Sequence, residues 1–183
     1  KLAMPSVVAI TSVSIQEIPY YFGFGFSSRT QQYSSEGSGS GIIVGENDDE
    51  LLIATNNHVV SGATTLSVCF VGNDVVSAEE ETAETASDST GDVNVEDAVS
   101  AKIKGTDESN DLAVIAVAKA DIPQDTLAQI KIAKLDTSDD LEVGEQVVAI
   151  GNALGYGQSV TTGIVSAKER TMDSYDGKLL QTD

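Results

Sequence analysis

Residues 38–60 read SGSGIIVGENDDELLIATNNHVV and indicate the fold class, because they hold two strand-like runs and the turn between them. Ser40–Val44 and Leu51–Thr55 are rich in aliphatic and β-branched residues, which favour strands. The polar run Glu46–Glu50 separates them, as the turn of a β-hairpin does. The stretch therefore predicts a hairpin, with His58 placed where the chain leaves the sheet.

More runs of the same kind lie on either side of this hairpin. They are Val7–Val13, Thr65–Val71, Val99–Ile103 and Leu112–Val117. Short strands without any long helical period are typical of a closed antiparallel barrel or a sandwich. We therefore expect an all-β fold, with a first β-barrel lobe over residues 5–135.

A second group of strand-like runs follows at Gly144–Gly151, Val160–Ala167 and Leu179–Thr182. Three strands are too few to close a barrel of this size. The sequence therefore predicts the start of a second β-barrel lobe over residues 141–183, which remains incomplete within this chain.

Two stretches are predicted to be loops. The first, about residues 16–38, centres on the glycine and aromatic run Tyr20–Phe26. Such a loop either docks on a neighbouring subunit or substrate or folds back over its own barrel, and the sequence leaves both open. The second, residues 72–97, holds nine acidic residues and no basic one, which is typical of a solvated insertion. A calcium site there is disfavoured because no Asp-x-Asp-x-Asp-Gly motif is present.

Composition narrows the function classes. Hydrophobic residues make up 40% of the chain, which is a globular composition. The formal net charge of −19 argues against nucleic acid and anionic membranes as partners, since their phosphates would repel the chain. No apolar run is long enough to span a bilayer, no signal peptide is visible, and no motif indicates a metal or another cofactor.

Neither the single cysteine nor the glycine-rich runs predict a site. Cys69 lies in an apolar run, a setting that favours a small buried hydrophobe over a nucleophile. Ser38–Gly41 and Gly151–Gly157 match neither a dinucleotide fingerprint nor a P-loop. We expect these glycines at tight turns and barrel corners.

Two residues are candidates for acid–base chemistry. His58 is the only histidine of the chain, and imidazole titrates near neutral pH. Asp111 precedes the apolar run Leu112–Val117, where a partly buried carboxylate needs hydrogen-bond donors. Taken alone, each has an ordinary structural interpretation, His58 as a structural histidine and Asp111 as an aspartate in a polar turn.

Four motifs occur in a fixed order along the chain. They are Ser38–Ile43 with Leu52–Ala63, then Gly105–Ile115, then Leu141–Asn152, and finally Ser159–Ala167 with Gln181–Asp183. Together they resemble the HtrA/Deg-type trypsin-like serine proteases, and the resemblance extends from about Pro5 to the last residue. The gap between His58 and Asp111 is longer than that family leads us to expect, and the acidic insertion at 72–97 accounts for the excess.

The resemblance implies a chymotrypsin/trypsin-like double β-barrel whose first barrel is complete and whose second is partial. It implies a serine endopeptidase of the protein quality control type, with His58 as general base and Asp111 as its orienting partner. In the family a Gly-Asn-Ser-Gly-Gly loop with the nucleophile follows Gln-Thr-Asp. This chain ends at Asp183, so we expect the serine beyond it, no PDZ domain, and an inactive fragment.

The resemblance also implies unfolded polypeptide substrates, a trimer-based homo-oligomer, and a full-length protein that is extracytoplasmic and membrane-anchored or at the cell surface. The alternative is a non-catalytic trypsin-like β-barrel that binds or scaffolds other proteins.

Overall fold

The computed structural model of the chain describes residues 3–20, 29–70, 98–151, 159–172 and 175–183. The acidic insertion predicted at 72–97 and most of the glycine turn predicted at 151–157 lie outside the described residues. The centre of the first predicted loop, residues 21–28, lies outside them as well.

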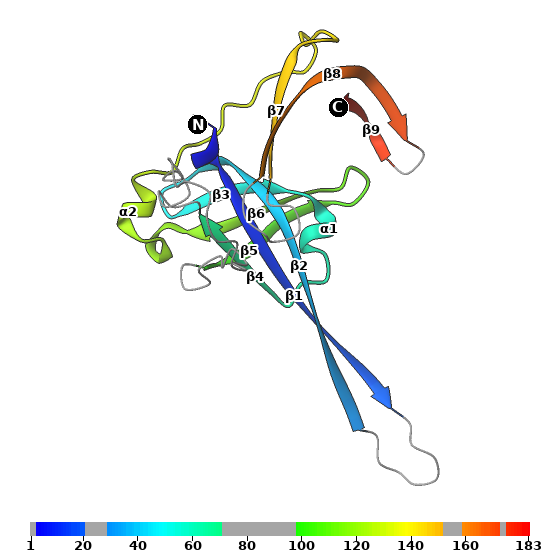
Figure 1. Ribbon diagram of the computed structural model, residues 1–183. Helices are drawn as coiled ribbons and strands as arrows, with labels where there is room; N and C mark the ends of the chain where they lie inside the picture. Colours follow the sequence, from blue (N-terminus) through cyan, green and yellow to red (C-terminus); the bar gives the residue numbers. More distant parts are fainter. Residues whose placement is uncertain (1–2, 21–28, 71–97, 152–158, 173–174) are drawn as a thin grey trace, which may run out of the picture.

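A closed antiparallel barrel forms the larger part of the fold (Figure 1). Its strands follow the order β1-β2-β3-β6-β5-β4 around the barrel. Their bounds are β1 Val7–Tyr20, β2 Arg29–Glu46, β3 Glu50–Thr55, β4 Thr65–Phe70, β5 Val99–Asp107 and β6 Leu112–Ala118. The predicted all-β class and the closed barrel are confirmed.

A three-stranded antiparallel sheet follows, in the order β7-β8-β9. Its strands are β7 Gln146–Gly151, β8 Ser159–Met172 and β9 Tyr175–Thr182. This sheet lies beside the barrel, and β7 contacts both β1 and β2 (Figure 1). The predicted partial second barrel is confirmed as an open sheet.

In the part of the chain that the structure describes, helices are few and short. They are the 3₁₀ turns η1 Met4–Ser6 and η4 Lys119–Asp121, and the α-helices α1 Asn57–Val60 and α2 Gln124–Leu127. None of the helices in the described part of the chain is long and apolar enough to cross a bilayer.

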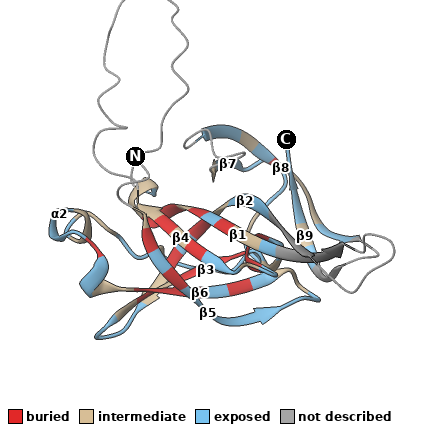
Figure 2. Cartoon of the chain, turned by 90° about the horizontal axis from the view of Figure 1, so that it is seen from below, coloured by how far each residue is buried: buried red, intermediate tan, exposed pale blue. Residues whose placement is uncertain are grey.

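The core of the barrel consists mainly of aliphatic side chains. Buried residues alternate with less buried ones along the barrel strands (Figure 2). In β3 the buried positions are Leu51, Ile53 and Thr55, and the residues between them are only partly buried. This period of two is the expected signature of a strand with one face on a core. Fully burying one such aliphatic side chain stabilises the fold by about 1.5–3 kcal/mol.

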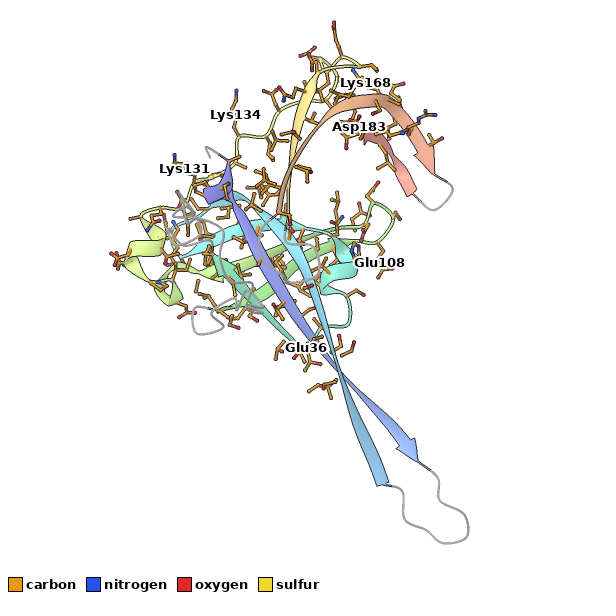
Figure 3. The ribbon with its side chains drawn as sticks, viewed as in Figure 1. Glu36, Glu108, Lys131, Lys134, Lys168 and Asp183 are labelled. Atoms are coloured by element: carbon orange, nitrogen blue, oxygen red, sulfur yellow. The ribbon has the colours of Figure 1, made fainter. Side chains whose placement is uncertain are left out.

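Three hydrogen bonds fix the second sheet locally. Lys168 Nζ on β8 donates to the carbonyl oxygen of Asp139 at 2.7 Å and also to that of Leu141, which ties the connecting segment to the sheet. The Asp183 carboxylate accepts a hydrogen bond from the backbone N–H of Ile164 at 2.8 Å. Figure 3 labels Lys168, on β8, and Asp183, directly after β9.

The loop predicted at about residues 16–38 is instead a long hairpin. β1 and β2 stay paired from Val7 opposite Ile42 to Tyr20 opposite Arg29. β4 pairs with β1 only as far as Val13, so the remainder of the hairpin extends beyond the barrel (Figure 1). The sequence of the extension, SIQEIPY on β1 and RTQQYSSEG on β2, shows no regular alternation of apolar and polar residues that would indicate a strand.

The sequence led us to expect the glycines of Ser38–Gly41 at turns or barrel corners. They lie instead inside β2. A Cβ on Gly39 would lie 2.6 Å from Val59 Cγ2, and one on Gly41 would lie 2.6 Å from Ile53 Cγ2. Real Cβ atoms do not approach other atoms so closely. These two positions therefore lack side chains because core residues pack directly onto the strand.

Replacing Gly39 with alanine is therefore expected to destabilise the protein by about 1–3 kcal/mol, the usual effect of overpacking a core. Urea unfolding followed by circular dichroism measures the change. Gly105→Ala is the matched control, because a Cβ at Gly105 would meet nothing within 4 Å. Equal stability of the two variants would show that Val59 moves aside at no cost.

Two apolar strand residues are less buried than their neighbours in the barrel core. Leu66 and Val68 are the buried positions of β4, so Cys69, one residue out of phase, is only half-buried. On β5, Val99 and Ala101 are buried, but Ile103 is 44% exposed. The register with β6 shifts just after Ile103, and the alternation stops there.

Candidate active site

His58 stands on a short helix that the core holds in place. β3 ends at Thr55, and α1 begins two residues later at Asn57. Val59 and Val60 of α1 are both buried in the barrel core. These two side chains anchor the helix on the core, while the His58 side chain remains 71% exposed.

Asp111 occupies the turn between β5 and β6. Its φ is 48°, in the left-handed region, which among non-glycine residues Asn and Asp tolerate best. The carboxylate is 30% exposed.

Strand pairing brings the two residues together. β3 and β6 are antiparallel neighbours, with Thr55 opposite Ala113. The end of β3, where His58 follows, therefore lies beside the start of β6, which Asp111 precedes. Residues 53 positions apart in sequence meet at one rim of the barrel.

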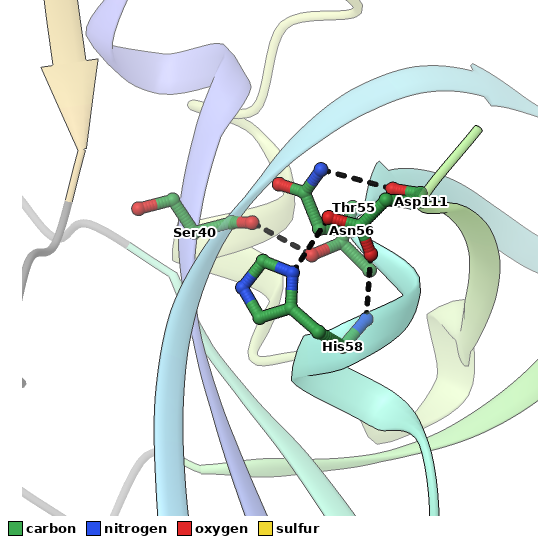
Figure 4. Close-up of polar contacts among 5 residues, drawn as sticks. All are labelled: Ser40, Thr55, Asn56, His58 and Asp111. Carbon is green, nitrogen blue, oxygen red and sulfur yellow. Dashed lines mark hydrogen bonds and ion pairs between the residues drawn. The ribbon is translucent and has the colours of Figure 1, made fainter. Parts of the chain in front are cut away.

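Asp111 accepts two hydrogen bonds from His58 (Figure 4). Its Oδ2 lies 2.7 Å from His58 Nδ1, and its Oδ1 accepts from the backbone N–H of His58 at 2.8 Å. The first bond orients the imidazole ring, and the second fixes the carboxylate on the backbone that carries the ring.

The backbone carbonyl of Asp111 is also held. It accepts from the backbone N–H of Asn57 at 3.1 Å and from the Asn56 side-chain amide at 2.9 Å. Nothing in the sequence analysis singled out Asn56. Its position directly before a helix start was the available signal, because Asn is common at such positions.

The electrostatics favour an ionised carboxylate. The pKa of Asp111 is lowered, chiefly because the backbone N–H of His58 donates to its carboxylate, although desolvation acts in the opposite direction. An ionised carboxylate can only accept, so His58 Nδ1 carries the proton of this hydrogen bond. The lone pair of the neutral imidazole is then on Nε2, the nitrogen that points away from Asp111 in Figure 4.

The Ser38–Gly41 run supports the same site from β2. Thr55 Oγ1 donates to the carbonyl oxygen of Ser40 at 2.8 Å, and Val59 of α1 packs on Gly39. On the other side of β2, a Cβ at Gly151 of β7 would lie 3.2 Å from Ser40 Oγ. The run thus lies between the helix that carries His58 and the second sheet, and it contacts both.

The arrangement provides a base. A neutral imidazole with a protonated Nδ1 oriented by a carboxylate can accept a proton at Nε2 and later return it. Among the residues that the structure describes, no three His, Cys, Asp or Glu side chains group as metal ligands do.

The family model described as a trypsin-like peptidase domain matches residues 39–183. The serine protease Do-like HtrA of Bacillus subtilis (strain 168) is 34% identical over 170 residues, which is 92% of this chain and 31% of that protein. The periplasmic pH-dependent serine endoprotease DegQ of Escherichia coli (strain K12) is 31% identical over 190 residues, covering 98% of this chain and 34% of that protein.

Among solved structures, the HtrA-type protease AlgW with tripeptide matches with a TM-score of 0.56 and 26% identity. The match covers 93% of this chain and 39% of that one. The chain spans about a third of the length of the curated relatives it matches.

Proposed function

Because this chain belongs to the HtrA-type trypsin-like peptidases, we propose that it carries two residues of the catalytic triad of a serine endopeptidase, the general base and the carboxylate that orients it. In this proposal His58 is the general base and Asp111 orients it. The observation that supports the proposal most directly is the 2.7 Å contact between His58 Nδ1 and Asp111 Oδ2. Residues 5–135 would form the first lobe, and residues 141–183 the start of the second.

The chemistry explains why these two side chains are needed. A serine hydroxyl is a weak nucleophile until a base takes its proton, and His58 Nε2 is the atom that would do so. His58 would then return the proton to the amine that leaves the cleaved peptide bond. Asp111 would keep the imidazole in the tautomer with Nδ1 protonated and stabilise the imidazolium as it forms.

We place the serine nucleophile in residues that follow Asp183. Gln181–Asp183 resembles the family segment that leads to the nucleophile loop, and that loop also supplies the oxyanion-hole amides. The 183-residue chain alone is then expected to be inactive, because it holds two of the three triad residues.

The substrate and the setting are proposed from the relatives. HtrA-type AlgW was solved with a tripeptide, and DegQ is named a periplasmic endoprotease. We propose that this protein cleaves unfolded or misfolded polypeptides outside the cytoplasm, as a trimer-based homo-oligomer anchored to the membrane or at the cell surface.

Labelling with a fluorophosphonate, which reacts with activated serines, tests the proposal by intact mass. The 183-residue chain is expected to give no adduct. The protein expressed with the residues encoded after Asp183 is expected to give one adduct per chain, on a serine in those residues, and to degrade an unfolded protein.

Two outcomes would contradict the proposal. An adduct on the 183-residue chain would place an activated serine inside it, and the nucleophile assignment would be wrong. A longer protein that binds unfolded polypeptides without adduct or cleavage would instead be a non-catalytic binding module.

A further inference from the structure

We propose that Asp107 is a positioning residue for the His58–Asp111 pair, because its carboxylate closes the turn that presents Asp111 to His58. This inference rests on the proposed function, since it concerns the same pair. Asp107 touches neither His58 nor any reacting atom in this scheme, and it would act only through the turn.

The Asp107 carboxylate binds the residue next to Asp111. Its Oδ1 accepts from the backbone N–H of Asn110 at 3.1 Å, and its Oδ2 accepts from the Asn110 side-chain amide at 2.8 Å. The backbone N–H of Asp111 in turn donates to the carbonyl oxygen of Glu108 at 3.3 Å. The turn from Asp107 to Asp111 is thus closed by its own first side chain.

Both donors of Asn110 lower the pKa of Asp107, the side-chain amide more than the backbone N–H. Asp107 therefore stays a carboxylate with two acceptor oxygens at neutral pH. An asparagine at this position keeps one acceptor oxygen but places an NH₂ group against one of the two donors.

Asp111 needs such support because its backbone is in an unfavourable conformation. A φ of 48° is costly for a residue with a Cβ and persists where the surroundings hold it. On one side Asp111 is held by β6 and by its contacts with Asn56, Asn57 and His58. On the other side, the closed turn of Asp107 is what holds it.

The consequence is geometric. The Asp111 carboxylate must reach the Nδ1 and the backbone N–H of His58 together, at 2.7 and 2.8 Å. Hydrogen bonds weaken steeply with distance and angle, so a rotation of the turn would lose one of them. Nδ1 would then lose the acceptor that selects its protonated tautomer.

The single histidine makes this measurable in the chain itself. In ¹⁵N-labelled protein at alkaline pH, where imidazoles are neutral, the nitrogen shifts of His58 report the ratio of its two tautomers. The low-field signal of the Nδ1 proton reports the hydrogen bond to Asp111. The variants are Asp107→Ala, Asp107→Asn, Asp111→Asn and, as control, Glu108→Gln.

Glu108→Gln is a matched control because the substitution removes one negative charge from the same turn. Its side chain is exposed at the barrel rim beside α1, where Figure 3 labels it. The contact of Glu108 described above is made by its backbone carbonyl, which Glu108→Gln keeps. Thermal unfolding of every variant checks that the barrel remains folded, and the nearly isosteric Asp107→Asn decides the question if Asp107→Ala does not fold.

We expect Asp107→Ala to lose the Nδ1 proton signal and to shift the tautomer ratio toward Nε2–H, with Asp107→Asn between it and the unmodified chain. Glu108→Gln should match the unmodified chain. If both Asp107 variants also match it while Asp111→Asn loses the signal, this inference is overturned and the proposed function stands. A change with Glu108→Gln of equal size would also overturn it, because charge alone would then explain the effect.

A third outcome would overturn both proposals together. If Asp111→Asn leaves the signal and the tautomer ratio unchanged, Asp111 does not orient His58. The proposed function and the role of Asp107 would then both be wrong.

Discussion

Replacing His58 with alanine is expected to lower kcat on the order of a million-fold in the protein that includes the proposed nucleophile. Alanine removes the atom that would take the serine proton, so only oxyanion stabilisation and substrate binding would remain. KM for an unfolded substrate is expected to change little. Single-turnover hydrolysis of a fluorogenic peptide measures the loss over a wide range.

The control for this change is Glu108→Gln, which lies at the same rim and is expected to retain full activity. A His58→Ala protein that kept more than about a hundredth of its activity would contradict the role of His58, because general acid–base catalysis alone contributes about 10²–10⁴-fold. In that case the base would have to be sought elsewhere.

The second large effect is expected for Asp111→Asn, a loss of about 10⁴-fold in kcat, as for the corresponding change in a serine-protease triad. Asparagine fits the site, because it tolerates the left-handed φ of 48° as aspartate does. The variant should therefore keep its fold and lose the acceptor that selects the Nδ1-protonated tautomer. Hydrolysis kinetics and urea unfolding, measured together, separate the two effects.

The double variant checks whether the two residues act as a unit. His58→Ala combined with Asp111→Asn should be no slower than His58→Ala alone, because an orienting carboxylate has no role without the imidazole. Additive losses would mean that Asp111 contributes to the reaction by a route independent of His58.

Sequence patterning predicted the barrel because the relevant signals are local. Ser40–Val44 and Leu51–Thr55 are rich in aliphatic and β-branched residues, and the polar run Glu46–Glu50 separates them clearly. The family resemblance then indicated His58 and Asp111 as a pair. Their contact depends on the antiparallel pairing of β3 with β6, which no local pattern in the chain contains.

What the sequence did not reveal depends on tertiary contacts. Gly39 and Gly41 look like turn residues until Val59 and Ile53 are seen packed on them. The β1–β2 extension mixes polar and apolar residues irregularly, so its sequence lacks the alternation that identifies a half-buried strand. Asp107 and Asn110 are three residues apart, a spacing typical of turn-capping side chains, but the role of the turn depends on where Asp111 points.

Because of the strand order, the number of residues between His58 and Asp111 does not determine how the two side chains meet. The long acidic insertion at 72–97 falls between β4 and β5, and the pair is carried by the neighbouring strands β3 and β6. Each doubling of a loop between fixed ends adds only about 0.6 kcal/mol of closure entropy. The connection between β4 and β5 can therefore lengthen or shorten over evolution at little cost in stability, because neither β3 nor β6 has to move.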